Sequence, residues 1–133
     1  MSTYLKYAID PNEIQTVVKN GVAIGFEVKT KIPYYRGVSL SLVDTVKITL
    51  DGREYGPEDM TFTLGEDTYT LDEMSTMPDL RWEFGEKMTI FVKRPGGIHL
   101  GTHTVDVFIG IRVSYMGMVL PFRQSFTVCP MGG

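Results

Sequence analysis

The chain has few of the residues that form disulfides or bind metals, and it has no long apolar run. Its 133 residues include one cysteine, Cys129, and two histidines, so an internal disulfide is excluded. A lone thiol suits a reducing compartment, and a small buried or terminal cysteine is favoured over a nucleophile because no histidine is near in sequence. No stretch approaches the ~20 apolar residues of a membrane span. The first ten residues lack an apolar run, so we expect no signal peptide and a cytoplasmic protein.

A strong excess of charge is also missing. The formal net charge is −3, and the basic residues are scattered singly along the chain. Such scatter gives no electrostatic footprint for a phosphate backbone, so nucleic acid is not an expected partner. The hydrophobic fraction of 43% and the charged fraction of 22% are typical of a globular protein, and we expect one domain over residues 1–133.

The sequence does contain alternation of apolar and polar residues with a period of two. Segments 26–32, 45–51 and 87–93 each place apolar side chains on one face, which predicts half-buried strands. The longest such run, 105–113, predicts a central strand, and 126–128 suggests a closing one. Phe108 and Gly110 on the second face of 105–113 indicate that part of this face is covered too, with another chain as one candidate for the cover.

Turn residues separate these runs and set the fold class. A single helical turn is expected around 71–77, capped by Asp72 or Ser75 and ended by Pro78. Seven or eight short strands with this spacing predict an all-β protein, an antiparallel β-sandwich or jelly roll. The expected turns are a two-residue hairpin at Asp51-Gly52, a longer hairpin at Gly65-Glu66-Asp67, and a loop with positive φ at Pro95-Gly96-Gly97.

The segment 33–42 differs from an ordinary connecting loop because it combines aromatic residues with an arginine. Tyr34, Tyr35 and Arg36 are residue types enriched at interface hot spots, which favours a partner-facing or ligand-facing role. Trp82 could stack on a sugar ring or fill the end of the sandwich, and a core position is the more usual one for tryptophan.

Catalytic and metal-binding patterns are weak. His99 and His103 would lie about 13 Å apart in an extended strand, so they could share a metal only if the loop from Gly97 to Gly101 folded back, and we expect no metal site here. The chain shows no nucleophile elbow and no phosphate-binding glycine loop, so no catalytic residue is assigned. A group of carboxylates resembles a solvated surface more than a catalytic pair: Asp72, Glu73, Asp79, Glu83 and Glu86.

An ordered series of short blocks resembles the beta subunits of bacterial C-glycoside deglycosidases and their uncharacterised relatives. The resemblance covers nearly the whole chain, and no block is a named catalytic signature. The blocks are Pro33-Tyr34-Tyr35-Arg36-Gly37, Tyr69-Thr70-Leu71-Asp72-Glu73-Met74, Arg81-Trp82-Glu83-Phe84-Gly85, Arg94-Pro95-Gly96-Gly97 and Arg112-Val113-Ser114-Tyr115-Met116.

The resemblance implies a β-sandwich bound to a larger α subunit, a (β/α)8 barrel of the sugar-isomerase type that holds a divalent metal, usually manganese. It implies a carbon–carbon lyase acting on 3-oxo-C-glucosides of flavonoid or other aromatic aglycones, with this chain inactive alone and several α/β pairs in the assembly. A base would remove the proton alpha to the sugar ketone while the metal stabilises the enolate oxygen. Tyr34, Tyr35 and Arg36 would face partner or substrate at the barrel mouth, with Trp82 and His99 as further candidates.

Two other functions remain open at this point. A stand-alone carbohydrate-binding module would use Trp82 and the tyrosines as sugar platforms, although such modules are generally secreted and attached to an enzyme. A purely structural subunit would keep its loops away from substrate, and substitution of Arg36 in an assembled complex would separate that role from a mouth-covering one.

Overall fold

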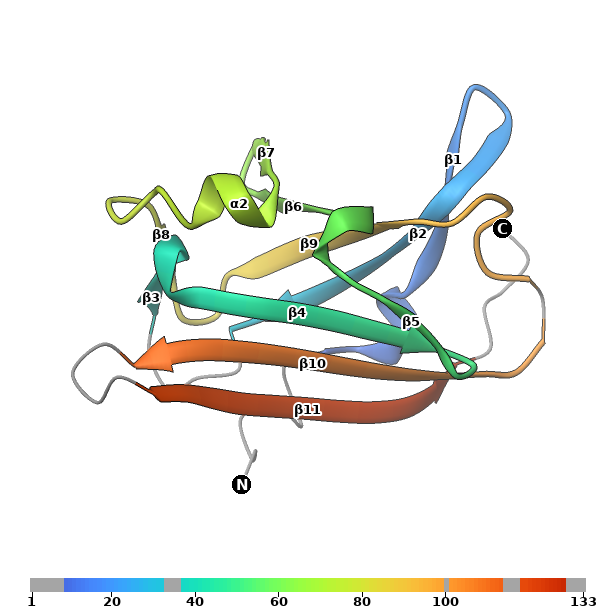
Figure 1. Cartoon of the computed structure of the whole chain (residues 1–133). Coiled ribbons are helices and arrows are strands. Elements are labelled where there is room, and N and C mark those ends of the chain that lie inside the picture. Colours follow the sequence, from blue (N-terminus) through green and yellow to red (C-terminus); the bar gives the residue numbers. More distant parts are fainter. Residues whose placement is uncertain (1–8, 33–36, 100, 114–117, 129–133) are drawn as a thin grey trace.

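The computed structural model describes residues 9–32, 37–99, 101–113 and 118–128. More than half of these residues belong to two antiparallel sheets stacked face to face (Figure 1). One sheet has the order β1 (Gln15–Lys19), β2 (Val22–Lys31), β9 (Lys87–Lys93), β6 (Met60–Leu64) and β7 (Asp67–Tyr69). The other has the order β11 (Met118–Val128), β10 (His103–Val113), β4 (Val43–Leu50) and β5 (Arg53–Tyr55).

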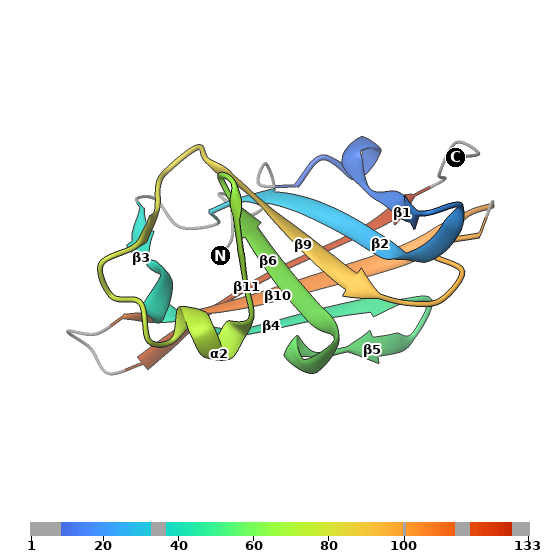
Figure 2. The same cartoon turned by 90° about the horizontal axis from the view of Figure 1, so that it is seen from above.

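Short elements complete the fold at the ends of these strands. A two-stranded ribbon pairs β3 (Val38–Ser39) with β8 (Arg81–Trp82) at one end of the sandwich. Figure 2 shows the same arrangement from above, with β2, β9 and β6 lying over β10 and β4. The remaining elements are the 3₁₀ turns η1 (Pro11–Glu13), η2 (Leu40–Leu42) and η3 (Pro57–Asp59) and the helix α2 (Leu71–Met74).

The core lies between the two sheets and follows from the alternation. The apolar positions of β4, β9 and β10 are buried and their polar neighbours are not. Thr30 interrupts the apolar face of β2 between Val28 and Ile32, and its hydroxyl donates to the carbonyl oxygen of Lys31 at 2.8 Å. This bond satisfies the one fully buried polar side chain on that face of β2. The predicted all-β antiparallel sandwich is therefore confirmed, and β10 is an interior strand of its sheet as expected.

Several local expectations need correction. The hairpin at Gly65 has a two-residue loop, because Asp67 already pairs with Leu64. The cap of α2 is Thr70 rather than Asp72 or Ser75. The alternation also gave no sign of β1, whose residues are half-exposed on both faces at the sheet edge.

The turn between β4 and β5 has the backbone conformation that its residues favour. Asp51 and Gly52 have φ of 50° and 88°, and Leu50 pairs with Arg53, which confirms the two-residue turn. The loop after β9 also has positive φ as expected, 91° at Gly96 and 64° at Gly97. In the described residues no helix is long and apolar enough to cross a bilayer.

Substitution of Thr70 tests the capping of α2. The Thr70 hydroxyl accepts from the Glu73 backbone N–H at 3.1 Å, and the Glu73 carboxylate accepts from the Thr70 N–H at 2.8 Å. We expect Thr70→Ala to cost about 1 kcal/mol of unfolding free energy in urea titrations. Thr70→Ser keeps the hydroxyl and should retain most of that stability; an equal loss in both variants would contradict the capping role.

Candidate functional site

The ribbon of β3 and β8 fixes the point at which the chain leaves the segment 33–36. Ser39 pairs with Arg81 in the ribbon, and the Arg81 guanidinium donates to the carbonyl oxygen of Gly37 at 2.9 Å. A Cβ on Gly37 would lie 2.9 Å from the carbonyl oxygen of Trp82, so only glycine allows this close approach. The residue that follows Arg36 is therefore rigidly attached to β8.

Trp82 is the core residue of this end. Its side chain is 1% exposed, and the indole N–H donates to the carbonyl oxygen of Glu86 at 2.7 Å. Both the apolar ring and the polar N–H are thus satisfied within the chain. This burial leaves no ring face open for a sugar, so the sugar-platform role considered for Trp82 is not supported and the core position is.

Two apolar side chains beside Trp82 are exposed instead. Phe84 is 62% exposed and Leu80 is 40% exposed, on either side of an ion pair in which Arg81 Nε lies 3.6 Å from Glu83 Oε2. A large aromatic group in contact with water next to a charged rim has the composition of a protein interface. Sequence reasoning missed Phe84, although a phenylalanine between Glu83 and Gly85 in a polar turn was a usable signal.

The other candidates from the sequence fall elsewhere. Tyr34, Tyr35 and Arg36 lie outside the described residues. His99 lies in the loop between β9 and β10, at the end of the sandwich opposite β8 (Figure 1). The structure therefore separates Trp82 from His99, and one flat surface cannot contact both.

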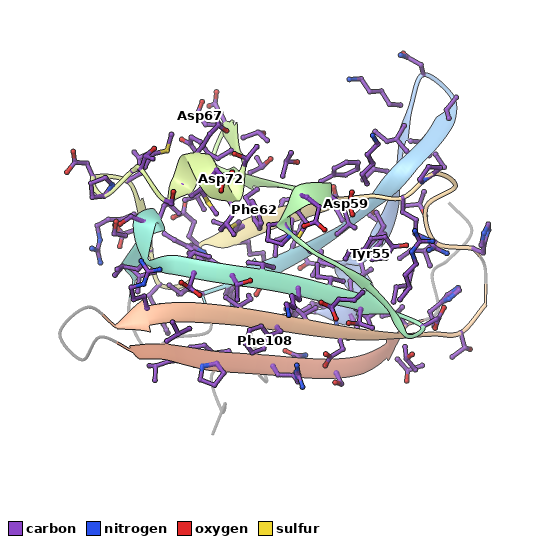
Figure 3. All side chains as sticks on the ribbon, in the orientation of Figure 1. Tyr55, Asp59, Phe62, Asp67, Asp72 and Phe108 are labelled. Carbon is purple, nitrogen blue, oxygen red and sulfur yellow. The ribbon has the colours of Figure 1, made fainter. Side chains whose placement is uncertain are left out.

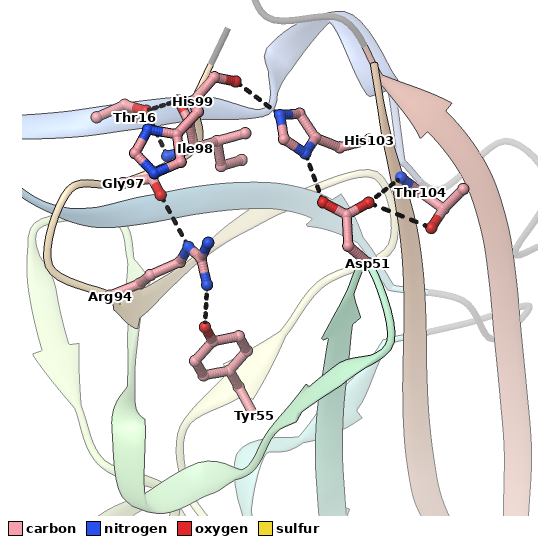
Figure 4. A network of polar contacts seen from close by, with 9 residues as sticks. All are labelled: Thr16, Asp51, Tyr55, Arg94, Gly97, Ile98, His99, His103 and Thr104. Carbon is pink, nitrogen blue, oxygen red and sulfur yellow. Dashed lines mark hydrogen bonds and ion pairs between the residues drawn. The ribbon is translucent and has the colours of Figure 1, made fainter. Parts of the chain in front are cut away.

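The loop from Arg94 to His103 is held by a polar network (Figure 4). Thr16 accepts from the backbone N–H of Ile98 at 2.9 Å, and its hydroxyl donates to the carbonyl oxygen of the same residue at 3.2 Å. A Cβ on Gly97 would lie 2.3 Å from a Thr16 methyl group, so the loop packs directly on β1. The two histidines do come together, but through the His99 backbone rather than through both rings.

His103 lies between two hydrogen-bond acceptors. Its Nδ1 is 2.5 Å from Asp51 Oδ2, and its Nε2 is 2.7 Å from the carbonyl oxygen of His99. An ionised carboxylate and a carbonyl oxygen only accept, so both bonds form only when the imidazole carries both protons. The bond to Asp51 therefore raises the pKa of His103, against the opposing effects of partial burial and of Arg94. The same bond, with the Thr104 backbone N–H, lowers the pKa of Asp51.

Three of the five clustered carboxylates have structural partners in this chain. Glu73 caps α2, Glu83 pairs with Arg81, and Glu86 accepts from the Glu83 backbone N–H at 3.1 Å. Across the described ranges, no three His, Cys, Asp or Glu residues come close enough to hold one metal ion. A metal bound by the His103 ring would have to displace one of its two partners, the Asp51 carboxylate or the His99 carbonyl oxygen.

Comparison with known proteins gives a consistent result. The model of the family "C-glycoside deglycosidase beta subunit" matches residues 4–115. The C-glycoside deglycosidase beta subunit of Eubacterium cellulosolvens is 31% identical over 119 residues, which cover 86% of this chain and 81% of the relative. The protein of the same name from Arthrobacter globiformis is 28% identical, over 74% of this chain and 75% of its own. The 3'-dehydrocarminate deglycosidase beta subunit of a Microbacterium species is 25% identical, over 69% of each chain.

Substitution of Trp82 tests its role in the core. Trp82→Ala should cost about 3–5 kcal/mol of unfolding free energy, because it leaves a large cavity beside the ribbon. Trp82→Phe fills most of the space but leaves the Glu86 carbonyl without its donor, so we expect a smaller loss of about 1–3 kcal/mol. Chemical denaturation measures both values. A nearly neutral Trp82→Ala would show that the indole is not packed as described.

The His103–Asp51 bond predicts a pH dependence of stability. Its contribution is complete above the ordinary aspartate pKa of 3.8 and below the ordinary histidine pKa of 6.5. It is lost as the pH rises through the raised pKa of His103, or falls through the lowered pKa of Asp51. His103→Gln should therefore lower the melting temperature most within that window and progressively less at alkaline pH.

His99→Gln is the matched control, because it removes the other imidazole and leaves the backbone carbonyl that His103 contacts. Thermal unfolding of both variants and the parent chain across this pH range measures the difference. A destabilisation by His103→Gln that does not change with pH would contradict the assigned bond.

Proposed function

The chain belongs to the family of C-glycoside deglycosidase beta subunits, and we propose that it is the non-catalytic subunit of a carbon–carbon lyase. The designation of the relatives as beta subunits implies a partner α subunit. We propose that this partner is a larger sugar-isomerase-like (β/α)8 barrel and that the complex contains several α/β pairs in the cytoplasm. The single observation that carries the proposal is the family match over residues 4–115.

The substrate proposed for the complex is a 3-oxo-C-glucoside of a flavonoid or other aromatic aglycone. One relative is named for a dehydro substrate, 3'-dehydrocarminate, which supports an oxidised sugar as the group that is processed. A ketone on the sugar makes the neighbouring C–H acidic. A base on the α subunit would take that proton, and the electron pair of the broken C–H bond would form a new double bond in the sugar. The aglycone carbon would leave with the electron pair of the broken C–C bond and would then be protonated.

A divalent metal, manganese in this proposal, belongs to the α subunit and would supply Lewis-acid stabilisation of charge on the ketone oxygen. The described residues of this chain do not fit such an ion, since no three of their His, Cys, Asp or Glu side chains come close enough to hold it. We therefore assign no catalytic step to this chain. Its role is to bind the α subunit, cover the barrel mouth and keep water from the reacting sugar.

The end of the sandwich that carries β3 and β8 is the surface we propose for this contact. Phe84 and Leu80 are exposed there beside the Arg81–Glu83 ion pair. Gly37, fixed to Arg81, directly follows the segment that contains Tyr34, Tyr35 and Arg36. The exposed Phe84 lies in the short turn that directly follows β8, so few further side chains need to be ordered when a partner covers it. His99 lies at the opposite end and is not part of the proposed contact.

Assembly with the α subunit tests the function. Activity on a 3-oxo-C-glucoside with manganese should appear only when both purified subunits are mixed, and the two should co-elute in size-exclusion chromatography. A chain that ignores the α subunit but binds free sugar would contradict the proposal and favour the carbohydrate-binding module.

Phe84→Ser tests the surface within the same experiment. Phe84 is 62% exposed and Val22, at the β1–β2 turn, is 60% exposed, so Val22→Ser is a matched control. Loss of an aromatic side chain that the α subunit buries on binding should weaken assembly at least about tenfold, and the control should change assembly little. Equal effects of the two substitutions would place the contact elsewhere. Arg36→Ala with intact assembly and unchanged turnover would favour a purely structural subunit.

A further inference from the structure

A cavity of about 360 Å³ lies at the open edge between the two sheets, far from the ribbon of β3 and β8. It is located where the chain crosses from β5 to β6 through η3, and Figure 3 labels two of its residues, Tyr55 and Asp59. Neither the family relation nor the proposed function assigns a role to this cavity. Its lining residues are Arg53, Tyr55, Asp59, Lys93, Arg94 and Pro95.

The lining carries a surplus of positive charge in an acidic protein. Arg53, Lys93 and Arg94 give three positive charges and Asp59 one negative charge, so the formal sum is +2, whereas the whole chain carries −3. The ion pairs seen within the described part of the chain all use other cations. Asp59 therefore offsets only part of the positive charge of the three cations, and the net charge of the lining attracts an anion locally.

The two guanidinium groups are held in place before any ligand arrives. Arg94 donates from Nε to the carbonyl oxygen of Gly97 at 2.9 Å and from Nη1 to the Tyr55 hydroxyl at 2.5 Å (Figure 4). Arg53 lies over the Tyr55 ring, with its guanidinium carbon 5.3 Å from the ring centroid. Tyr55 itself is 4% exposed and packs edge-to-face against Phe26 at 6.1 Å.

Arg94 lines the cavity and keeps hydrogen-bond donors that these bonds do not use. The two bonds of Arg94 to other described residues use two of its five guanidinium N–H groups. A planar guanidinium matches a carboxylate in a two-point contact, and Lys93 adds a mobile point charge at the rim. The Asp59 carboxylate disfavours an anion of high charge by repulsion. Pro95 and the Tyr55 ring form the apolar part of the lining.

We propose that this cavity binds a carboxylate group. Its volume is at the small end of the range for ligand sites, so it accommodates a small aromatic or aliphatic acid, or one acidic side chain of a partner. The inference holds whether or not the chain assembles with a larger subunit, because every group that recognises the carboxylate belongs to this chain.

The test is a titration of the isolated ¹⁵N-labelled chain with benzoate and, separately, with inorganic phosphate, at constant ionic strength. Benzoate should shift the amide signals of Arg53, Lys93 and Arg94 with a millimolar dissociation constant, and phosphate should bind more weakly. Arg53→Gln and Lys93→Gln should each weaken benzoate binding about threefold to tenfold. Both side chains are exposed, so these variants are expected to fold.

Lys31→Gln is the matched control, with the same change of charge. Lys31 lies six residues along β2 from Gly25, the residue paired with Lys93, and so roughly 20 Å away. The absence of a shift at the amides of Arg53, Lys93 and Arg94 would overturn the proposal. Phosphate binding at least as tight as benzoate binding would also overturn it. An equal effect of Lys31→Gln would also overturn it, because the attraction would then come from net charge alone.

The same variants distinguish a free carboxylate from one supplied by the α subunit. If benzoate still binds in the assembled complex and the Arg53→Gln/Lys93→Gln double variant assembles normally, the ligand is a free acid. If assembly blocks benzoate and the double variant weakens assembly, an acidic side chain of the partner occupies the cavity. Loss of benzoate binding in the double variant is required in both cases.

Discussion

The interior strands of the two sheets must each bury one apolar face against the opposite sheet, and the positions of the candidate sites follow from this constraint. The buried residues of β4, β9 and β10 meet in one cluster between the sheets. A shift of any strand by one residue would turn this face to water, so the register is fixed. The ends of the strands, and therefore the connecting loops, are presented as two separate surfaces on a rigid body.

The two surfaces have different chemistry. The end with β3 and β8 exposes Phe84 beside the Arg81–Glu83 pair and leads directly into the segment 33–36. The loop between β9 and β10 at the other end is fixed through Thr16 and His103, and the edge between β5 and β9 next to it carries the basic cavity. An apolar surface favours a protein partner, and a cavity lined with arginine favours a small anion or a single acidic group.

The alternation of apolar and polar residues was enough to predict the sheets, because a half-buried strand places apolar side chains on one face and polar side chains on the other. It failed where a strand is exposed on both sides, as in β1, and at Thr30, where a polar residue is buried. Asp51-Gly52 could be predicted because turn residues act locally, whereas the capping of α2 depends on the pairing of Thr70 with Glu73. The cavity could not be predicted at all, because Tyr55 and Arg94 come from different sheets and are brought together only by the packing of those sheets.

We propose that the chain docks on its α subunit through the end that carries β3 and β8. Hydrogen–deuterium exchange of this chain, free and bound to the α subunit, tests it most directly. We expect increased protection of the backbone amides from Gly37 to Ser39 and from Leu80 to Phe84, with the β1–β2 turn unchanged. Protection confined to the β1–β2 turn or to the outer face of β10 and β11 would contradict it.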